Sequence, residues 1–441
     1  IHNCTSKGYI YGYVDRTFVG GITAVNFGTI TNCTNTAIVG GGAAGLMAAW
    51  AAAEEGAAVT LFEQNEKCGK KIYITGKGRC NVTNDCDPQE YLTHVVNGAK
   101  FLTGAVYAFP PRALMEHLER GGLKLKTERG NRVFPVSDKA SDVTKCLENY
   151  CRDVGVKIKF DTKVLKLSIL NSTMRGIITE KGEFLCDNVI ICTGGKSYPS
   201  TGSRGDGYVF AAQAGHNVKE PVPSLCGVNL KGDYFKPMQG LSLKNVGLKV
   251  FVKGKLIKDL FGEMQFTHFG ASGPLILTAS ALINRCMPSD VRLVLDFKPA
   301  LSQEQLSARI LRDFEEFKNK DISNCLKNLL PSSAIEPVLA RCAIQPDKKI
   351  NSVTKAERAS LLTNLKNFDI LFSSVRGFEE AVVTSGGVSL SEVNPKTMES
   401  KLVKGLYFAG EVLDADAFTG GFNLQIAFST GFCAGRAAAR Q

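Results

Sequence analysis

Three glycines early in the chain have the spacing of a dinucleotide-binding turn. Gly40, Gly42 and Gly45 fit G-x-G-x-x-G and directly follow the apolar residues 37–39. In such a turn the first glycine permits a tight bend, the second lets backbone N–H groups approach a pyrophosphate, and the third lets a helix pack on the strand. Glu63 follows a second apolar run, at a distance where a carboxylate can bind ribose hydroxyl groups. We therefore expect dinucleotide binding.

Further glycine-containing segments lie far along the chain. They read GKGRCN at 76–81, TGG at 193–195, GEVLD at 410–414 and TGGFNLQ at 419–425. FAD is long enough to require such a distribution, because the first helix N-terminus holds one end while a distant segment must clamp the flavin ring. Gly410-Glu411, after an apolar run, resembles the G-D/E segment that two-dinucleotide-binding flavoproteins use against the ribityl and pyrophosphate groups. With the glycine turn and Glu63, this resemblance implies that the segments belong to a single FAD site.

Composition narrows the class of protein. The chain has 441 residues, of which 44% are hydrophobic and 22% charged, as in globular proteins with two or three domains. The net charge of +11 is spread along the chain without a dense Lys/Arg block, which favours a solvated basic surface over a nucleic-acid site. With no apolar run of about 18 residues, we expect no membrane association and a cytoplasmic location.

Cysteine and histidine are placed without the spacing of a metal site. None of the 14 cysteines forms C-x-x-C, and several lie in apolar runs where cysteine acts as a small core residue. The five histidines are scattered. We expect free thiols and no metal.

The pattern along the chain changes at several points. Residues 1–35 alternate glycine with Thr, Asn and aromatic residues and resemble one unit of a GLUG-type β-repeat, which cannot bury its own apolar face. A nucleotide-binding domain is expected at 36–220 and 375–441. It is interrupted by a β-rich segment at 221–300 and a helical segment at 301–374. A helix is predicted at 139–153, after the N-cap candidates Ser137 and Asp138.

Several longer motifs resemble the BaiN/YhiN-type flavoprotein family, which includes aminoacetone-oxidase-like members and a bile-acid reductase. The resemblance covers about residues 36–441, and its motifs are 75–84, 132–141, 197–199 with 201–202 and 205–207, 267–270 with 272–274, and 384–388. It implies an α/β fold: a Rossmann-like FAD-binding domain of the two-dinucleotide-binding flavoprotein type, with an inserted β-barrel-like and helical domain.

The resemblance also implies the residues that hold noncovalent FAD. At the pyrophosphate, ribose and adenine it places Gly40, Gly42, Ala43, Ala44, Gly45, Glu63 and Val164. Along the rest of the cofactor it places Lys71, Gly78, Arg79, Cys80, Asn81, Thr193, Gly194, Gly410, Glu411, Asp414, Gly420, Gly421, Asn423, Leu424 and Gln425.

The catalytic residues are less defined. Cys80 lies beside Arg79 but has no nearby resolving cysteine, so a small residue packed by the flavin is favoured over a redox thiol. Tyr198 and His268 are possible proton donors, although their glycine-rich surroundings favour a structural role.

The sequence favours one activity and leaves two others open. The favoured activity is reduction of a small organic substrate by an FAD-dependent oxidoreductase. Since the insertion holds no second G-x-G-x-x-G, NAD(P)H would visit the flavin transiently. The first alternative is a flavin oxidase of an amine or hydroxyl compound. The second, less favoured, is an RNA-associated flavoprotein.

Overall fold

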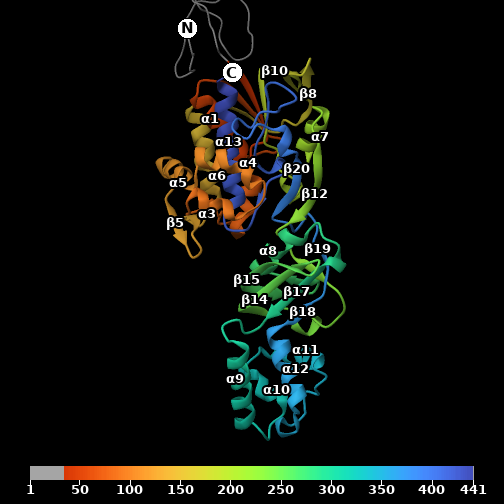
Figure 1. The fold of residues 1–441 in the computed structure, drawn as a ribbon. Helices are drawn as coiled ribbons and strands as arrows, with labels where there is room; N and C mark the ends of the chain where they lie inside the picture. Colours follow the sequence, from red (N-terminus) through yellow and green to blue (C-terminus); the bar gives the residue numbers. More distant parts are fainter. Residues whose placement is uncertain (1–33, 441) are drawn as a thin grey trace, which may run out of the picture. The chain divides into compact units, whose positions relative to one another are not determined.

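The computed structural model describes residues 34–440 (Figure 1). The chain forms two compact units, one from the residues up to Val222 and from Val382 onward, the other from Pro223–Ala381. The repeat expected at 1–35 lies outside the described residues except for Thr34 and Asn35, and Asn35 already begins the first strand.

A five-stranded parallel sheet forms the centre of the first unit. Its order is β21 (Leu406–Phe408), β11 (Asn188–Ile191), β1 (Asn35–Val39), β2 (Ala58–Phe62) and β7 (Lys157–Lys159). Strands β21, β11, β1 and β2 are short, mostly apolar and buried, as expected where helices cover both faces, whereas the edge strand β7 is largely exposed. Strand order changes direction at β1, and ligands of such sheets bind at the carboxyl end of this switch point.

Helices α1 (Ala43–Glu54) and α13 (Phe422–Ala439) pack closely beside this sheet (Figure 1). A Cβ atom added at Gly431 would lie 2.4 Å from the Ala44 carbonyl oxygen, and one at Gly435 would lie 2.3 Å from that of Ala48. The two glycines of α13 therefore permit backbone contact with the alanine-rich α1. This contact joins the end of the chain to the helix that follows the glycine turn.

Helix α6 (Ala140–Asp153) matches the predicted helix, but its N-cap differs from the two candidates. The N-cap residue is Lys139, which makes no capping hydrogen bond through its side chain. Asp138 has φ +55° and pairs with Arg79 and Lys126 instead. A tertiary ion pair thus uses the carboxylate that could have capped the helix.

Smaller sheets and helices complete the first unit. The sheets are β3 (Thr83–Asn84), β6 (Arg132–Pro135) and β5 (Leu125–Glu128); β8 (Val164–Leu170), β9 (Thr173–Thr179) and β10 (Gly182–Leu185); β12 (Val218–Ser224) with β20 (Val383–Val388); and β4 (Val95–Asn97) with β22 (Asp416–Ala417). The helices are α2 (Lys70–Ile74), α3 (Pro88–Thr93), α4 (Ala99–Ala108), α5 (Pro111–Arg120) and α7 (Asp206–Gln213).

The second unit has its own sheet and its own core. Its antiparallel sheet has the order β18 (Phe368–Ile370), β17 (Val291–Asp296), β14 (Ser242–Val252), β15 (Lys255–Phe266), β16 (Gly270–Ser272), β13 (Val228–Leu230) and β19 (Phe372–Val375). Its helices are α8 (Pro274–Ile283), α9 (Gln303–Glu316), α10 (Ile322–Cys325), α11 (Ser332–Arg341) and α12 (Lys355–Lys366). Residues 368–375, placed mostly in the helical segment by the sequence, supply two further strands.

The described residues contain neither a membrane-spanning helix nor a cluster of metal-ligating side chains. Between residues 34 and 440, no helix combines the length and apolarity needed to cross a membrane. The same residues contain no group of three or more His, Cys, Asp or Glu side chains that could hold a metal ion.

Candidate functional site

The three glycines of the fingerprint have different structural roles. Gly40 has φ +105°, and a Cβ atom there would lie 2.6 Å from the Cys192 carbonyl oxygen. A Cβ atom at Gly45 would lie 1.8 Å from the Gly40 oxygen. At Gly42 it would meet no atom within 4 Å. Two glycines are therefore needed for packing, while the third borders open space.

That open space lies at the N-terminus of α1. Gly42 is the N-cap residue, so no side chain caps the helix, and its first turn carries no acidic residue. The first N–H groups of a helix have no partner within the helix, and the helix dipole gives this end a partial positive charge. The geometry suits the phosphate groups of a dinucleotide.

Glu63, at the end of β2, is 6% exposed. Its Oε2 accepts a hydrogen bond from the Gly41 N–H at 2.7 Å, and its Oε1 accepts from Asn65 N and Nδ2 at 2.8 and 2.6 Å. A Cβ atom at Gly41 would lie 2.9 Å from Oε2. The fingerprint leaves position 41 free, so this requirement for Gly41 was not expected from the sequence. A carboxylate has about four acceptor positions, so one remains, on Oε2.

A second carboxylate, Glu411, brings four distant segments together. Its Oε2 accepts from Lys71 Nζ of α2 at 2.6 Å. Its Oε1 accepts from Ser197 Oγ and from the Thr384 N–H, both at 2.9 Å. Lys71 Nζ also lies 2.5 Å from Ser197 Oγ. We call Lys71, Ser197, Thr384 and Glu411 the Glu411 cluster. The sequence analysis named Lys71 and Glu411 but not the roles of Ser197 and Thr384.

Three side-chain oxygens of the expected cofactor residues are buried without a hydrogen-bond partner among the described residues. They are Asn81 Oδ1, Thr193 Oγ1 and Asp414 Oδ1. The other carboxylate oxygen of Asp414 accepts from Lys219 Nζ at 3.2 Å. Because buried polar atoms are nearly always satisfied, these oxygens fit a site that contacts a polar ligand.

The GKGRCN segment includes several residues in left-handed conformation. Gly76, Lys77 and Cys80 have φ near +60°. Arg79 is held by Glu128 and Asp138, and its guanidinium lies 4.2 Å from the centre of the Phe134 ring. The positive charge of Arg79 is therefore balanced by protein carboxylates. Gly78, which lies between Lys77 and Arg79 in the sequence, is exposed.

Cys80 lies in the core and is fully buried. Burial raises the pKa of its thiol to about 12, so the neutral thiol predominates at physiological pH, whereas a redox nucleophile must be a thiolate. If NAD(P)H reduces the flavin, as expected from the sequence, Cys80→Ser should keep the rate of that reduction within about tenfold, a barrier change of roughly 1.4 kcal/mol. The measurement is stopped-flow absorbance of the flavin. A much larger loss with FAD still bound would make Cys80 part of the reaction.

The first turn of α13 is held by hydrogen bonds of its own side chains. Asn423 bonds to the backbone of Ala417, and Gln425 Oε1 accepts from Thr83 Oγ1 at 2.7 Å. A Cβ atom at Gly421 would lie 2.3 Å from the Thr83 carbonyl oxygen. Asn423 therefore holds the start of α13 to β22, while Gly421 and Gln425 hold it to β3, which follows the GKGRCN segment.

The other residues expected to bind the cofactor differ in burial and in backbone conformation. Val164 is buried at the start of β8, Gly194 has φ +71°, and Gly410 has φ +78° and packs on Ala44. Leu424 and Gly420 are half-buried.

The three catalytic candidates are not gathered in one unit. Cys80 belongs to the first unit, as does Tyr198, a half-buried residue with φ +52°. His268 belongs to the second unit, where its exposed ring lies 5.0 Å from that of Phe269.

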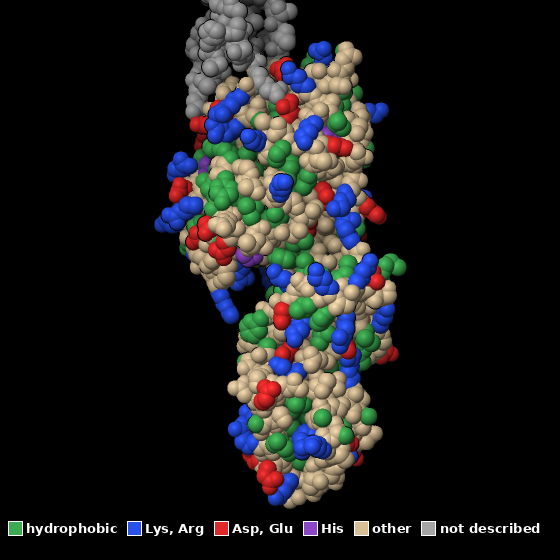
Figure 2. All heavy atoms as spheres, in the orientation of Figure 1, with side chains coloured by type: hydrophobic (Ala, Val, Ile, Leu, Met, Phe, Trp, Pro, Cys, Tyr) green, Lys and Arg blue, Asp and Glu red, His purple; other side chains and the backbone are tan. Residues whose placement is uncertain are grey.

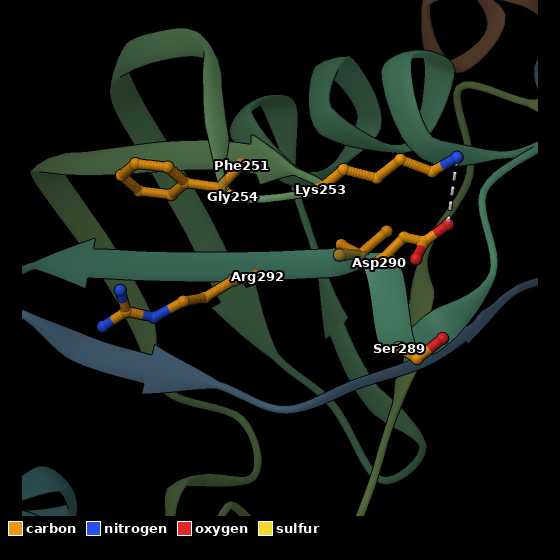
Figure 3. Close-up of a pocket in the computed structure, with 7 residues that line it drawn as sticks. Phe251, Lys253, Gly254, Ser289, Asp290 and Arg292 are labelled. Atoms are coloured by element: carbon orange, nitrogen blue, oxygen red, sulfur yellow. Dashed lines mark ion pairs between the residues drawn. The ribbon is translucent and has the colours of Figure 1, made fainter.

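A hollow of about 410 Å³ lies in the second unit, at the end of the β14–β15 hairpin (Figure 3). It is lined by Phe251, Lys253, Gly254, Ser289, Asp290, Val291 and Arg292. Its charged side chains are paired, Lys253 with Asp290 and Arg292 with Asp369. None of the residues expected from the sequence lines it.

Comparison with known proteins decides the family. The family model described as HI0933-like protein Rossmann domain matches residues 34–437. The chain belongs to the HI0933-like family. This is the BaiN/YhiN-type family of FAD-dependent oxidoreductases, so the resemblance and the α/β Rossmann fold class expected from the sequence are both confirmed.

The relatives of this HI0933-like chain carry two kinds of name. The 3-dehydro-bile acid delta(4,6)-reductase of Clostridium scindens is 32% identical over 410 residues, covering 92% of this chain and 98% of its own. The ribosomal RNA dihydrouridine synthase of Haemophilus influenzae is 29% identical, with coverage of 92% and 98%. That of Escherichia coli is 28% identical, with coverage of 89% and 95%.

Proposed function

We propose that this chain is an FAD-dependent reductase that takes hydride from NADH or NADPH and saturates a carbon–carbon double bond conjugated to a carbonyl group. The observation that carries FAD binding is the set of buried oxygens on Asn81, Thr193 and Asp414 that have no hydrogen-bond partner within residues 34–440. The open N-terminus of α1 supports it further.

The residues present fit each part of FAD. The N–H groups at the start of α1 would hold the pyrophosphate. Glu63 would accept a hydrogen bond from a ribose hydroxyl group at its remaining acceptor position. Glu411 and Asp414 would accept hydrogen bonds from hydroxyl groups of the ribityl chain. The carboxylates of Glu63 and Glu411 are already held by protein donors. FAD binding therefore costs little conformational entropy in these two side chains.

The names of the relatives support this choice of reaction. A delta(4,6)-reductase and a dihydrouridine synthase both add two hydrogen atoms across a carbon–carbon double bond. The chemistry that FAD supplies when bound is two-electron transfer, from the nicotinamide to the substrate. Overall, the nicotinamide would be oxidised, the β-carbon of the substrate would gain hydride, and its α-carbon would gain a proton that comes from the solvent.

Anaerobic mixing tests this proposal. NADH or NADPH should bleach the flavin absorbance of the purified protein, and an enone added afterwards should restore it without oxygen. If neither nicotinamide bleaches the flavin, the reductase is contradicted. Bleaching by an amine or hydroxyl compound, followed by peroxide formation in air, would establish the oxidase instead.

A second candidate keeps the chemistry and changes the substrate to uridine in RNA. Two relatives named ribosomal RNA dihydrouridine synthases favour it, and the net charge of +11 is compatible with it. On the face in Figure 2, however, Lys and Arg side chains are interspersed with Asp and Glu, as on a solvated surface. Incubation of the reduced protein with an unmodified ribosomal RNA transcript separates the candidates, since only an RNA enzyme adds two hydrogen masses to a uridine.

A further inference from the structure

The Glu411 cluster contains a side chain whose role differs from that of a direct cofactor ligand. We propose that Lys71 is a positioning residue, which acts through Glu411 so that this carboxylate offers FAD a single acceptor position on Oε2. The inference rests on the proposed function, because it requires FAD to occupy the site.

The directions of the hydrogen bonds define that position. The ammonium group of Lys71 is a hydrogen-bond donor only, so Nζ donates both to Ser197 Oγ and to Glu411 Oε2. The Ser197 hydroxyl then donates to Oε1, which also accepts from the Thr384 N–H. Three of about four acceptor positions on the carboxylate are filled. The fourth, on Oε2, is left for one hydroxyl group.

Burial makes this arrangement rigid. The side chains of Lys71 and Glu411 are 24% and 19% exposed. In such surroundings a charged hydrogen bond is stronger than at the surface, and removal of one partner leaves the other charge uncompensated. Lys71 therefore both neutralises Glu411 and fixes its orientation.

The backbone around the cluster is shaped to let these groups approach. A Cβ atom at Gly195 would lie 2.3 Å from Thr384 Oγ1 and 2.8 Å from Glu411 Oε1. Thr384 Oγ1 in turn accepts from the N–H groups of Lys196 and Ser197 at 2.8 and 3.1 Å. The last glycine of the TGG segment is thus required by the cluster, whatever its relation to FAD.

A double-mutant cycle on FAD affinity tests the inference. Lys71→Met, Glu411→Gln and the double variant are prepared as apoproteins and titrated with FAD by flavin fluorescence. Each single change should weaken binding by about tenfold or more, the value of a charged hydrogen bond. The double variant should be no weaker than the worse single variant, because Lys71 acts through Glu411. If the loss of affinity in the double variant equals the product of the two single losses, Lys71 contacts FAD independently of Glu411, and the proposal is overturned.

Lys70→Met is the matched control. Lys70 is the neighbour of Lys71 in α2, and it pairs with Glu66, whose side chain is 61% exposed. Its replacement should leave FAD affinity unchanged. A loss equal to that of Lys71→Met would mean that any lysine of α2 supports binding through general charge, which contradicts the proposal.

Two further results keep the test decisive. If Lys71→Met does not fold, Ser197→Ala carries the test: it removes one donor to Glu411 without leaving a charge unpaired, and must weaken FAD binding. Unchanged affinity in Ser197→Ala or Lys71→Met, with FAD bound by the wild type, overturns this inference alone. Failure of the wild type to bind FAD overturns the proposed function.

Discussion

Gly42→Val should abolish FAD binding and leave the apoprotein folded. The structure explains both the retained fold and the loss of FAD binding. Gly42 has φ −84°, which valine can adopt, and a Cβ atom there meets nothing within 4 Å. The same open space borders the uncapped N–H groups of α1, where the pyrophosphate would lie. We expect affinity to fall by at least about a hundredfold, or roughly 2.7 kcal/mol.

The measurements are FAD titration of the apoprotein and its thermal melt. Gly41→Ala provides a comparison, because its Cβ atom would lie 2.7 Å from Cys68 Sγ and 2.9 Å from Glu63 Oε2, and so would disturb Glu63 rather than occupy the space of the pyrophosphate. It should weaken FAD binding as well, through the ribose end. Wild-type affinity in Gly42→Val would mean that the fingerprint binds no pyrophosphate.

Gly431→Val should destabilise the first unit. A Cβ atom at this position would lie 2.4 Å from the Ala44 carbonyl oxygen, and backbone of α1 cannot yield without moving the helix that begins at the glycine turn. Overpacking of this kind costs about 3 kcal/mol. The variant should melt at a lower temperature and lose FAD at the same time, because α1 carries the site.

Ala437→Val is the control for Gly431→Val. It lies in the same helix but is partly exposed, so it should cost only the helix propensity difference of about 0.6 kcal/mol. Equal melting temperatures for the two variants would show that α1 and α13 are not in the close contact described above.

The features that were predicted best from the sequence are those that depend on a local residue pattern. The alternation of apolar strands and helices around the glycine turn was sufficient for the Rossmann fold, and the predicted helix at 139–153 is α6 (Ala140–Asp153). Its N-cap was wrong because Asp138 is used by Arg79 and Lys126, two residues from elsewhere in the chain. No local pattern carries that information.

The same reason limits the prediction of the site. Glu411 is joined to Lys71 across 340 positions, and Lys71 to Ser197 across 126. Ser197 lies in the 197–199 motif, which gave it no role, and Lys219 lies in no motif; only the fold places them beside Glu411 and Asp414. Gly41 could have been found, because three consecutive glycines exceed what the fingerprint needs.

The most direct test is to identify what the purified protein releases on denaturation. The protein should be yellow, and heat or acid should release FAD in proportion to the protein, since we propose noncovalent binding at α1, Glu63 and the Glu411 cluster. The released compound is identified by chromatography and mass spectrometry. Recovery of FMN, or a colourless protein that FAD cannot reconstitute, would contradict the account.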